Sequence, residues 1–168
     1  SSGESDERSS TVSAIVNAAG PWVNDVLARV EPRITPVDVS LVQGAHLVLE
    51  GEASHGVYYL ESPRDKRPVF VMPWQISDES KTDETQNQLR SAILLGTTET
   101  SFTGDPATLR PLPAEQEYLL ETYRHYFLAG QSDADVKIHD AFAGLRVLPA
   151  SLGPENASHA SLPRETVL

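Results

Sequence analysis

The chain has 168 residues, of which 24 are acidic and 13 basic, so its formal net charge at pH 7 is -11. This excess of negative charge argues against binding to nucleic acid or to an anionic membrane surface through bulk charge, although a few local arginines can still bind an anionic small molecule. The chain contains no cysteine, which excludes disulfides, thiolate catalysis and cysteine-ligated metal sites.

The first 36 residues predict a polar lead-in followed by a strand, a tight turn and a helix. Residues 1–10 are polar and acidic and lack the apolar core of a secretory signal, so we expect them to be disordered. The apolar, β-branched run 11–19 predicts a strand that ends at Gly20-Pro21. Apolar residues then recur at helical spacing: Val23, Val26, Leu27 and Val30. Such a unit usually belongs to a parallel sheet, so it needs partner strands.

The middle of the chain predicts short strands separated by turns. A linker over residues 32–36 precedes three apolar runs that are typical of strands: 41–49, 57–60 and 68–74. Gly44 and His46 fall on one face of the first strand, because side chains alternate between faces. Pro73 indicates that its strand ends there or lies at an edge. The polar segment Ser77–Gln88 predicts an exposed insertion with little order.

The next apolar run, residues 93–95, is followed by a polar turn. Gly96 ends the run, Thr97 and Thr98 place two hydroxyls after it, and residues 104–106 (Gly-Asp-Pro) close the stretch. The local pattern favours a core strand that runs into an exposed turn. The alternative is a strand that forms one wall of a ligand site.

Residues 114–128 predict the one clear helix, with Gly130 as its C-cap. Its apolar stripe is expected to contain Leu119, Tyr123, Tyr126 and Phe127. The run 136–148 predicts a final strand, in which the interior Gly144 indicates a bulge or a close backbone approach. Five strand signals and one helix between residues 41 and 148 predict an α+β fold, with an antiparallel or mixed sheet and the helix on one face.

Two residues are candidates for chemistry by their setting alone. His46 lies in an apolar strand and is either a hydrogen-bonded core histidine, which this pattern favours, or a site residue. Arg146 interrupts an apolar run, so it either pairs with a buried carboxylate or faces a pocket that takes an anion. The five histidines have no metal-ligand spacing, and the sequence contains no G-x-G-x-x-G, Walker or G-x-S-x-G motif.

Several blocks occur in an order and spacing typical of one family: 17–23 (NAAGPWV), 43–48 (QGAHLV), 67–74 (RPVFVMPW), 95–99 (LGTTE) with 104–106 (GDP), the helix 115–127, 143–146 (AGLR) and 164–165 (RE). With these blocks the chain resembles the FAD-dependent glycerol-3-phosphate dehydrogenases, the respiratory type that passes electrons to quinone. The first block also resembles the wider amino-acid oxidase superfamily, whereas the fourth and sixth blocks make the match specific.

Three departures from the family pattern accompany this resemblance. The family usually has Ser-Gly-Val-Arg-Pro-Leu where this chain has Ala-Gly-Leu-Arg-Val-Leu at residues 143–148, and the change is expected to loosen the pocket edge. Lysine is common where Gln43 stands. The insertion 77–88 lengthens a turn that is usually short.

The resemblance also implies a division of the chain. Residues 11–36 match the end of an FAD-binding domain, and residues 37–150 match a substrate-binding domain. They lie between the lead-in 1–10 and residues 151–168, which are expected to form a loop and the start of another strand. Because the family's proteins are much longer, we expect the chain to be an internal fragment that is inactive alone and holds FAD poorly.

Site residues follow from the matched blocks. The residues that match the turn at the flavin are Ala19, Gly20, Pro21 and Trp22. His46 matches a histidine near the flavin and the substrate, and is a candidate for the catalytic base. Arg146 and Arg164 match arginines that hold the substrate phosphate and polarise its hydroxyl, so Arg146 is also a catalytic candidate. Thr97 and Thr98 match a strand that lines the same region.

The resemblance implies oxidation of sn-glycerol 3-phosphate to dihydroxyacetone phosphate, with hydride passing from carbon 2 to FAD and electrons then to quinone. It implies a location at the cytoplasmic face of the bacterial inner membrane or at the mitochondrial inner membrane. Any membrane attachment would come from parts outside this chain, whose apolar runs are shorter than the ~20 residues of a spanning helix. Two alternatives stay open: an amine or amino-acid oxidase-type domain, in which Arg146 binds a carboxylate, and a non-catalytic truncated module.

Overall fold

The computed structural model describes residues 9–53, 55–77, 89–129 and 136–150. The chain divides into two compact units, residues 1–37 and 38–168, and each is considered by itself. Within the described ranges, no helix has both the length and the apolar character needed to cross a membrane.

The first unit contains a short helical turn. A 3-10 helix, η1 (Gly20–Trp22), leads directly into α1 (Val23–Leu27). The strand predicted over residues 11–19 is wrong, because no described segment pairs with this backbone and Ile15 and Val16 are 82% and 88% exposed. The Asn24 side chain forms two hydrogen bonds to the Val37 backbone, since it donates to the carbonyl and accepts from the N–H.

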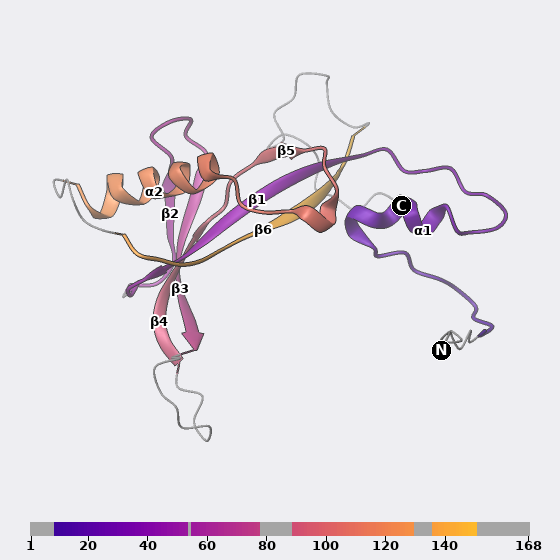
Figure 1. The fold of residues 1–168 in the computed structure, drawn as a ribbon, viewed down its shortest axis with the longest axis horizontal. Helices are drawn as coiled ribbons and strands as arrows, with labels where there is room; N and C mark the ends of the chain where they lie inside the picture. The colour runs from indigo at the N-terminus through magenta and orange to yellow at the C-terminus, as the bar shows by residue number, and fades with distance from the viewer. Residues whose placement is uncertain (1–8, 54, 78–88, 130–135, 151–168) are drawn as a thin grey trace, which may run out of the picture. The chain divides into compact units, whose positions relative to one another are not determined.

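The second unit is an antiparallel sheet with one long helix, and the predicted α+β class is confirmed (Figure 1). Its elements are β1 (Val39–Glu50), β2 (Tyr58–Glu61), β3 (Pro68–Ser77), β4 (Leu89–Gly96), β5 (Thr100–Phe102), η2 (Pro106–Thr108), α2 (Pro113–Phe127) and β6 (Ile138–Pro149). The short strand β5 was not predicted. The predicted loop and strand after residue 150, the cap Gly130 and the insertion 78–88 lie outside the described residues.

The long strand β1 organises the sheet. β6 pairs with β1 from Val39 to Leu49, so β4 and β5 must share the other edge of β1. β4 ends where Gly96 faces His46, and β5 begins where Thr100 faces Gln43. Residues 97–99 therefore stand opposite only two residues of β1, Gly44 and Ala45. The segment has one residue more than its partner, as in a β-bulge.

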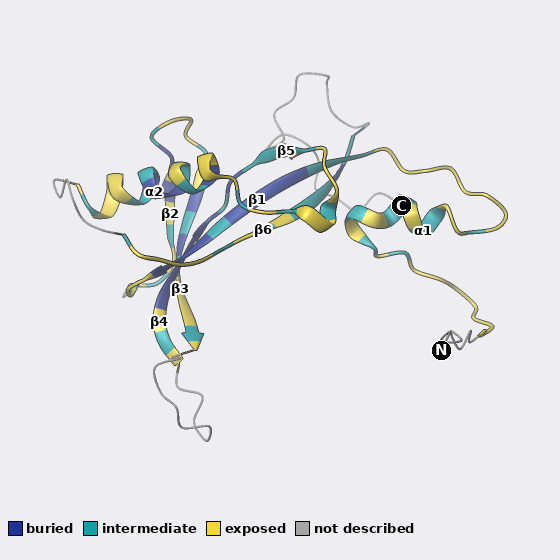
Figure 2. Cartoon of the chain, viewed as in Figure 1, coloured by how far each residue is buried: buried dark blue, intermediate teal, exposed yellow. Residues whose placement is uncertain are grey.

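The apolar core lies between the sheet and α2 (Figure 2). It consists of side chains that alternate along the strands, together with two leucines of the helix: Leu47, Leu49, Leu60, Val69, Val71, Ile93, Leu95, Leu119 and Leu120. Full burial of each such side chain stabilises the fold by about 1.5–3 kcal/mol. The predicted helix stripe is partly wrong, because Tyr126 is 46% exposed and its hydroxyl donates to the Glu61 carbonyl, whereas Thr122 is buried.

Pairing along the strands places Arg146, Gly44, His46 and Phe142 on the opposite face from α2. Val42 pairs with Arg146 and His46 pairs with Phe142, and antiparallel partners share a face. The predicted sharing of a face by Gly44 and His46 is thus confirmed.

The sequence predictions for Pro73 and Gly144 have different outcomes. Pro73 does not end β3, but β2 pairs only with residues 68–71, so at Pro73 the strand has β4 on one side and is locally an edge. The bulge or close approach predicted at Gly144 is wrong: its pairing with Gly44 is regular, and no described atom lies within 4 Å of a Cβ placed there. The register shift in this pair of strands lies between Val48 and Leu49.

Candidate functional site

A cavity of about 620 Å³ opens beside the interrupted strand. Its charged and polar lining includes His46, Arg67, Thr97, Glu99, Tyr118 and Arg146. A second cavity, of about 510 Å³ beside Trp74 and Ala92, has no cationic side chain among its described lining residues. The first cavity is therefore the candidate site for an anionic ligand.

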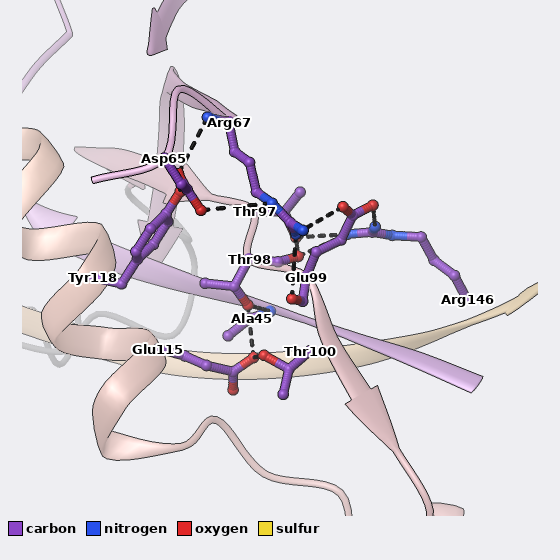
Figure 3. A network of polar contacts seen from close by, with 10 residues as sticks. All are labelled: Ala45, Asp65, Arg67, Thr97, Thr98, Glu99, Thr100, Glu115, Tyr118 and Arg146. Atoms are coloured by element: carbon purple, nitrogen blue, oxygen red, sulfur yellow. Dashed lines mark hydrogen bonds and ion pairs between the residues drawn. The ribbon is translucent and has the colours of Figure 1, made fainter. Parts of the chain in front are cut away.

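Arg146 is held by three acceptors in the segment 97–99 (Figure 3). Its Nη1 donates to Glu99 Oε1 at 2.8 Å, and its Nη2 donates to Thr97 Oγ1 and to the Thr98 carbonyl, both at 3.0 Å. The two interpretations left open by the sequence are thus both true, since Arg146 pairs with a carboxylate and also lines the cavity. These bonds use three of the five N–H groups of a guanidinium.

Thr98 points the other way, toward α2, as alternation along an extended segment requires. Its hydroxyl accepts from the Ala45 N–H at 2.8 Å and donates to Glu115 Oε1 at 2.7 Å. The segment 97–99 therefore joins the two faces of the sheet: Thr97 and Glu99 hold Arg146, and Thr98 anchors the segment to the helix.

Glu115 is a buried carboxylate, 5% exposed, in the first turn of α2. Besides Thr98, it accepts hydrogen bonds from Thr100 Oγ1 at 2.9 Å, from the Leu112 N–H at 2.9 Å and from Gln43 Nε2 at 2.5 Å. Its described partners are all neutral donors, four in number, so hydrogen bonding rather than a cation stabilises it. Gln43, which stands where the resemblance expects lysine, thus supplies a neutral donor to this carboxylate.

His46 packs on the open face of the sheet. Its ring stacks on Phe142, with centroids 5.2 Å apart, and Gly96 lies directly under it, where a Cβ would collide with the ring. Its Nδ1 is buried and has no hydrogen-bond partner among the described residues. A buried polar atom without a partner carries a free-energy cost, so Nδ1 lowers the stability of the fold where it stands.

Burial, and then the positive charge of Arg146, lower the pKa of His46 from its ordinary value of 6.5. The unfolded chain therefore takes up this proton first as pH falls. The contribution of His46 to stability is complete above pH 6.5 and is lost as the pH falls from 6.5 through the lowered pKa.

An NMR titration of the His46 ring is expected to give a midpoint below 6.5. The midpoint should rise in Arg146→Gln, because that variant removes a positive charge beside the ring. A midpoint at or above 6.5 in the parent protein would contradict the lowered pKa of His46. No rise in the variant would contradict the contribution of Arg146 to that lowering.

The four residues predicted to lie at the flavin form the turn of the first unit. Gly20 has φ +55°, a conformation that glycine adopts without strain, and no atom of the described residues lies within 4 Å of a Cβ placed on it. The Trp22 N–H donates to the Ala19 carbonyl at 3.1 Å, and Pro21 occupies the start of η1. An open backbone at a glycine fits the close approach of a flat cofactor such as FAD.

The cavity brings together four of the residues singled out from the sequence: His46, Thr97, Thr98 and Arg146. Arg164 lies outside the described residues. Sequence reasoning missed the roles of Glu99, Arg67 and Glu115. Glu99 directly follows the two threonines, and an acidic residue there was a usable signal for the partner that Arg146 requires.

Comparisons with known proteins find several relatives of this chain. A family model described as FAD dependent oxidoreductase matches residues 2–160. A glycerol-3-phosphate dehydrogenase of Pseudomonas aeruginosa is 32% identical over 139 residues, covering 80% of this chain and 23% of the relative. A D-erythritol 1-phosphate dehydrogenase of Brucella abortus is 31% identical over 134 residues, covering 80% of this chain and 24% of the relative.

A solved structure of the glycerol-3-phosphate dehydrogenase from Bacillus halodurans, complexed with FAD, has a TM-score of 0.56 and 26% sequence identity to this chain. The match covers 78% of this chain and 23% of that one. The chain thus spans about a quarter of the length of the relatives it matches.

Proposed function

This chain belongs to the FAD dependent oxidoreductase family, and from that membership we propose that it is the substrate-binding part of a flavoprotein that oxidises sn-glycerol 3-phosphate to dihydroxyacetone phosphate. The observation that carries the proposal is Arg146, a cation fixed by three hydrogen bonds on the wall of a cavity next to His46.

In the proposal, Arg146 binds the substrate's phosphate or its reacting oxygen and orients it in the cavity. Neutral His46 accepts the hydroxyl proton as oxidation proceeds, which its lowered pKa permits near pH 7. Thr97 and Thr98 form the wall that holds Arg146, and Arg164 stays a second candidate cation through the resemblance alone.

FAD, when bound, supplies the acceptor for the two electrons of the substrate. The residues of this chain proposed to hold it are Ala19, Gly20, Pro21 and Trp22, through the open turn of η1. Quinone is the proposed final acceptor, and a location at the bacterial or mitochondrial inner membrane follows from the same resemblance.

A panel of substrates tests the proposed function directly. The intact protein, meaning the longer polypeptide of which this chain is expected to be a part, should when loaded with FAD reduce an artificial electron acceptor with glycerol 3-phosphate. Erythritol 1-phosphate is the second candidate substrate, because one relative is named for it. Turnover of glycine or sarcosine, without turnover of either phosphate, would contradict the proposal and favour the amino-acid oxidase alternative.

Gly44→Ala is expected to lower kcat/KM about tenfold or more, because small displacements of a site residue have effects of this size. A Cβ on Gly44 would lie 2.6 Å from Arg146 Nη2 and 2.6 Å from Thr97 Oγ1, so both side chains must move. Gly144→Ala is the matched control: it lies directly opposite on β6, its Cβ meets no described atom, and kcat/KM should stay within about twofold. If kcat/KM of Gly44→Ala also stays within about twofold of the parent, activity does not depend on the exact placement of Arg146.

A further inference from the structure

Glu99 lies between two arginines of the cavity wall (Figure 3). Its Oε1 accepts from Arg146 Nη1 at 2.8 Å, and its Oε2 accepts from Arg67 Nη1 at 3.0 Å. The Glu99 side chain is 11% exposed, whereas those of Arg146 and Arg67 are 31% and 34% exposed. The carboxylate is thus the more deeply placed partner, and each arginine keeps surface facing the cavity.

The three charges come from separate parts of the fold. Arg67 directly precedes β3, Glu99 stands between β4 and β5, and Arg146 belongs to β6, on the far side of β1. Arg67 is itself held by Asp65, at 3.5 Å from its Nε, and Asp65 accepts from the Tyr118 hydroxyl at 2.8 Å. A continuous polar chain therefore runs from α2 through Arg67 and Glu99 to Arg146.

We propose that Glu99 is a positioning residue, which fixes the Arg146 guanidinium for the substrate and limits the positive charge of the site. The inference rests on the function proposed above. Glu99 acts through Arg146: a charge-assisted hydrogen bond from a carboxylate restricts an arginine that would otherwise sample many rotamers. The two arginines balance Glu99 and Asp65, which pairs with Arg67, so this group of four side chains has no net formal charge.

These two effects of Glu99 can be separated, because charge acts at long range and geometry at short range. Glu99→Gln raises the net charge of the group from 0 to +1, so anions should bind more tightly. The same substitution removes the charge-assisted hydrogen bond and leaves Arg146 with its bonds to Thr97 and the Thr98 carbonyl, so the guanidinium is held less firmly and turnover should fall. A residue that merely braced the fold would instead lower stability, anion binding and turnover together.

The experiment uses the FAD-loaded intact protein and three variants: Glu99→Gln, Glu99→Asp and Glu117→Gln. Glu99→Gln is expected to lower kcat for glycerol 3-phosphate about 10- to 100-fold. Calorimetric titration with inorganic phosphate should show binding about threefold tighter or more. Glu99→Asp should recover part of the lost kcat, because it keeps the charge but is too short to reach both arginines.

Glu117→Gln is the matched control, because Glu117 is an exposed acid of α2 that pairs with Arg124 away from the cavity lining. Its kcat and phosphate affinity should stay within about twofold of the parent.

A kcat of Glu99→Gln equal to that of the parent would overturn the proposal. The proposal would also be overturned if Glu99→Gln bound phosphate more weakly than the parent and were also less stable to unfolding. If the parent protein does not oxidise glycerol 3-phosphate, the proposed function fails, and the phosphate titration alone decides the inference. In that case unchanged or weaker phosphate binding by Glu99→Gln overturns it, and tighter binding supports it.

Discussion

Replacing Arg146 with glutamine is expected to lower kcat/KM for glycerol 3-phosphate by a factor of about 10²–10³, the usual effect of removing one donor that stabilises developing charge. The variant loses the cation that the cavity presents beside His46. It also removes one hydrogen-bond donor each from Glu99, the Thr98 carbonyl and the Thr97 hydroxyl. Steady-state kinetics of the FAD-loaded intact protein with glycerol 3-phosphate measures the effect.

Arg146→Lys distinguishes charge from geometry. Lysine keeps the positive charge, but its single ammonium cannot reproduce a planar group that bonds to three acceptors while facing a ligand. We expect Arg146→Lys to remain at least tenfold impaired. Arg124→Gln is the control, because Arg124 is an exposed arginine of α2 paired with Glu117, and it should leave kcat/KM within about twofold of the parent. Full activity in Arg146→Gln would show that Arg146 contributes neither to substrate binding nor to turnover.

Replacing Glu115 with alanine is expected to destabilise the second unit by about 3 kcal/mol or more. The substitution removes the acceptor of one N–H of the Gln43 amide, which keeps its bond to the Arg110 carbonyl, and of two threonine hydroxyls and the Leu112 N–H. Buried donors without acceptors cost about 1–3 kcal/mol each, although the hydroxyls can rotate to new partners. Urea-induced unfolding of the intact protein gives the change in stability.

Glu115→Gln should destabilise less than Glu115→Ala, because the amide keeps one acceptor oxygen while turning its NH₂ toward a donor. Glu117→Ala is the matched control on an exposed part of the same helix, and its effect should stay within about 0.5 kcal/mol. Equal destabilisation by Glu115→Ala and Glu117→Ala would show that the buried network contributes nothing.

The sequence predicts well those elements whose apolar residues are continuous or regularly spaced. β1 is recognisable as a continuous apolar run, since residues 42–45 and 47–49 are all buried, and α2 is recognisable from its length and its acidic first turn. The helix stripe was partly misjudged, since the buried positions include the polar residues Glu115 and Thr122. Hydrophobic periodicity cannot identify polar residues that are buried by hydrogen bonding.

The sequence singled out four of the residues that line the cavity, but not the contacts between them. His46, Thr97, Thr98 and Arg146 meet at one cavity, as the matched blocks implied. The interruption at residues 97–99 was not foreseen, because it depends on two strand segments sharing one edge of β1, which is a property of register rather than of local sequence. The pairing of Glu99 with Arg67 could not be predicted for the same reason, because the two residues lie 32 positions apart in the sequence and are brought together by the register of the sheet.

Anaerobic reduction of bound flavin by glycerol 3-phosphate is the most direct test of the central claim, that the cavity beside Arg146 and His46 serves the oxidation of a polyol phosphate. Stoichiometric glycerol 3-phosphate added to the FAD-loaded intact protein should remove the absorbance of oxidised flavin, and glycine or sarcosine should leave it unchanged. Flavin that stays oxidised with glycerol 3-phosphate but is reduced by glycine or sarcosine would contradict the account.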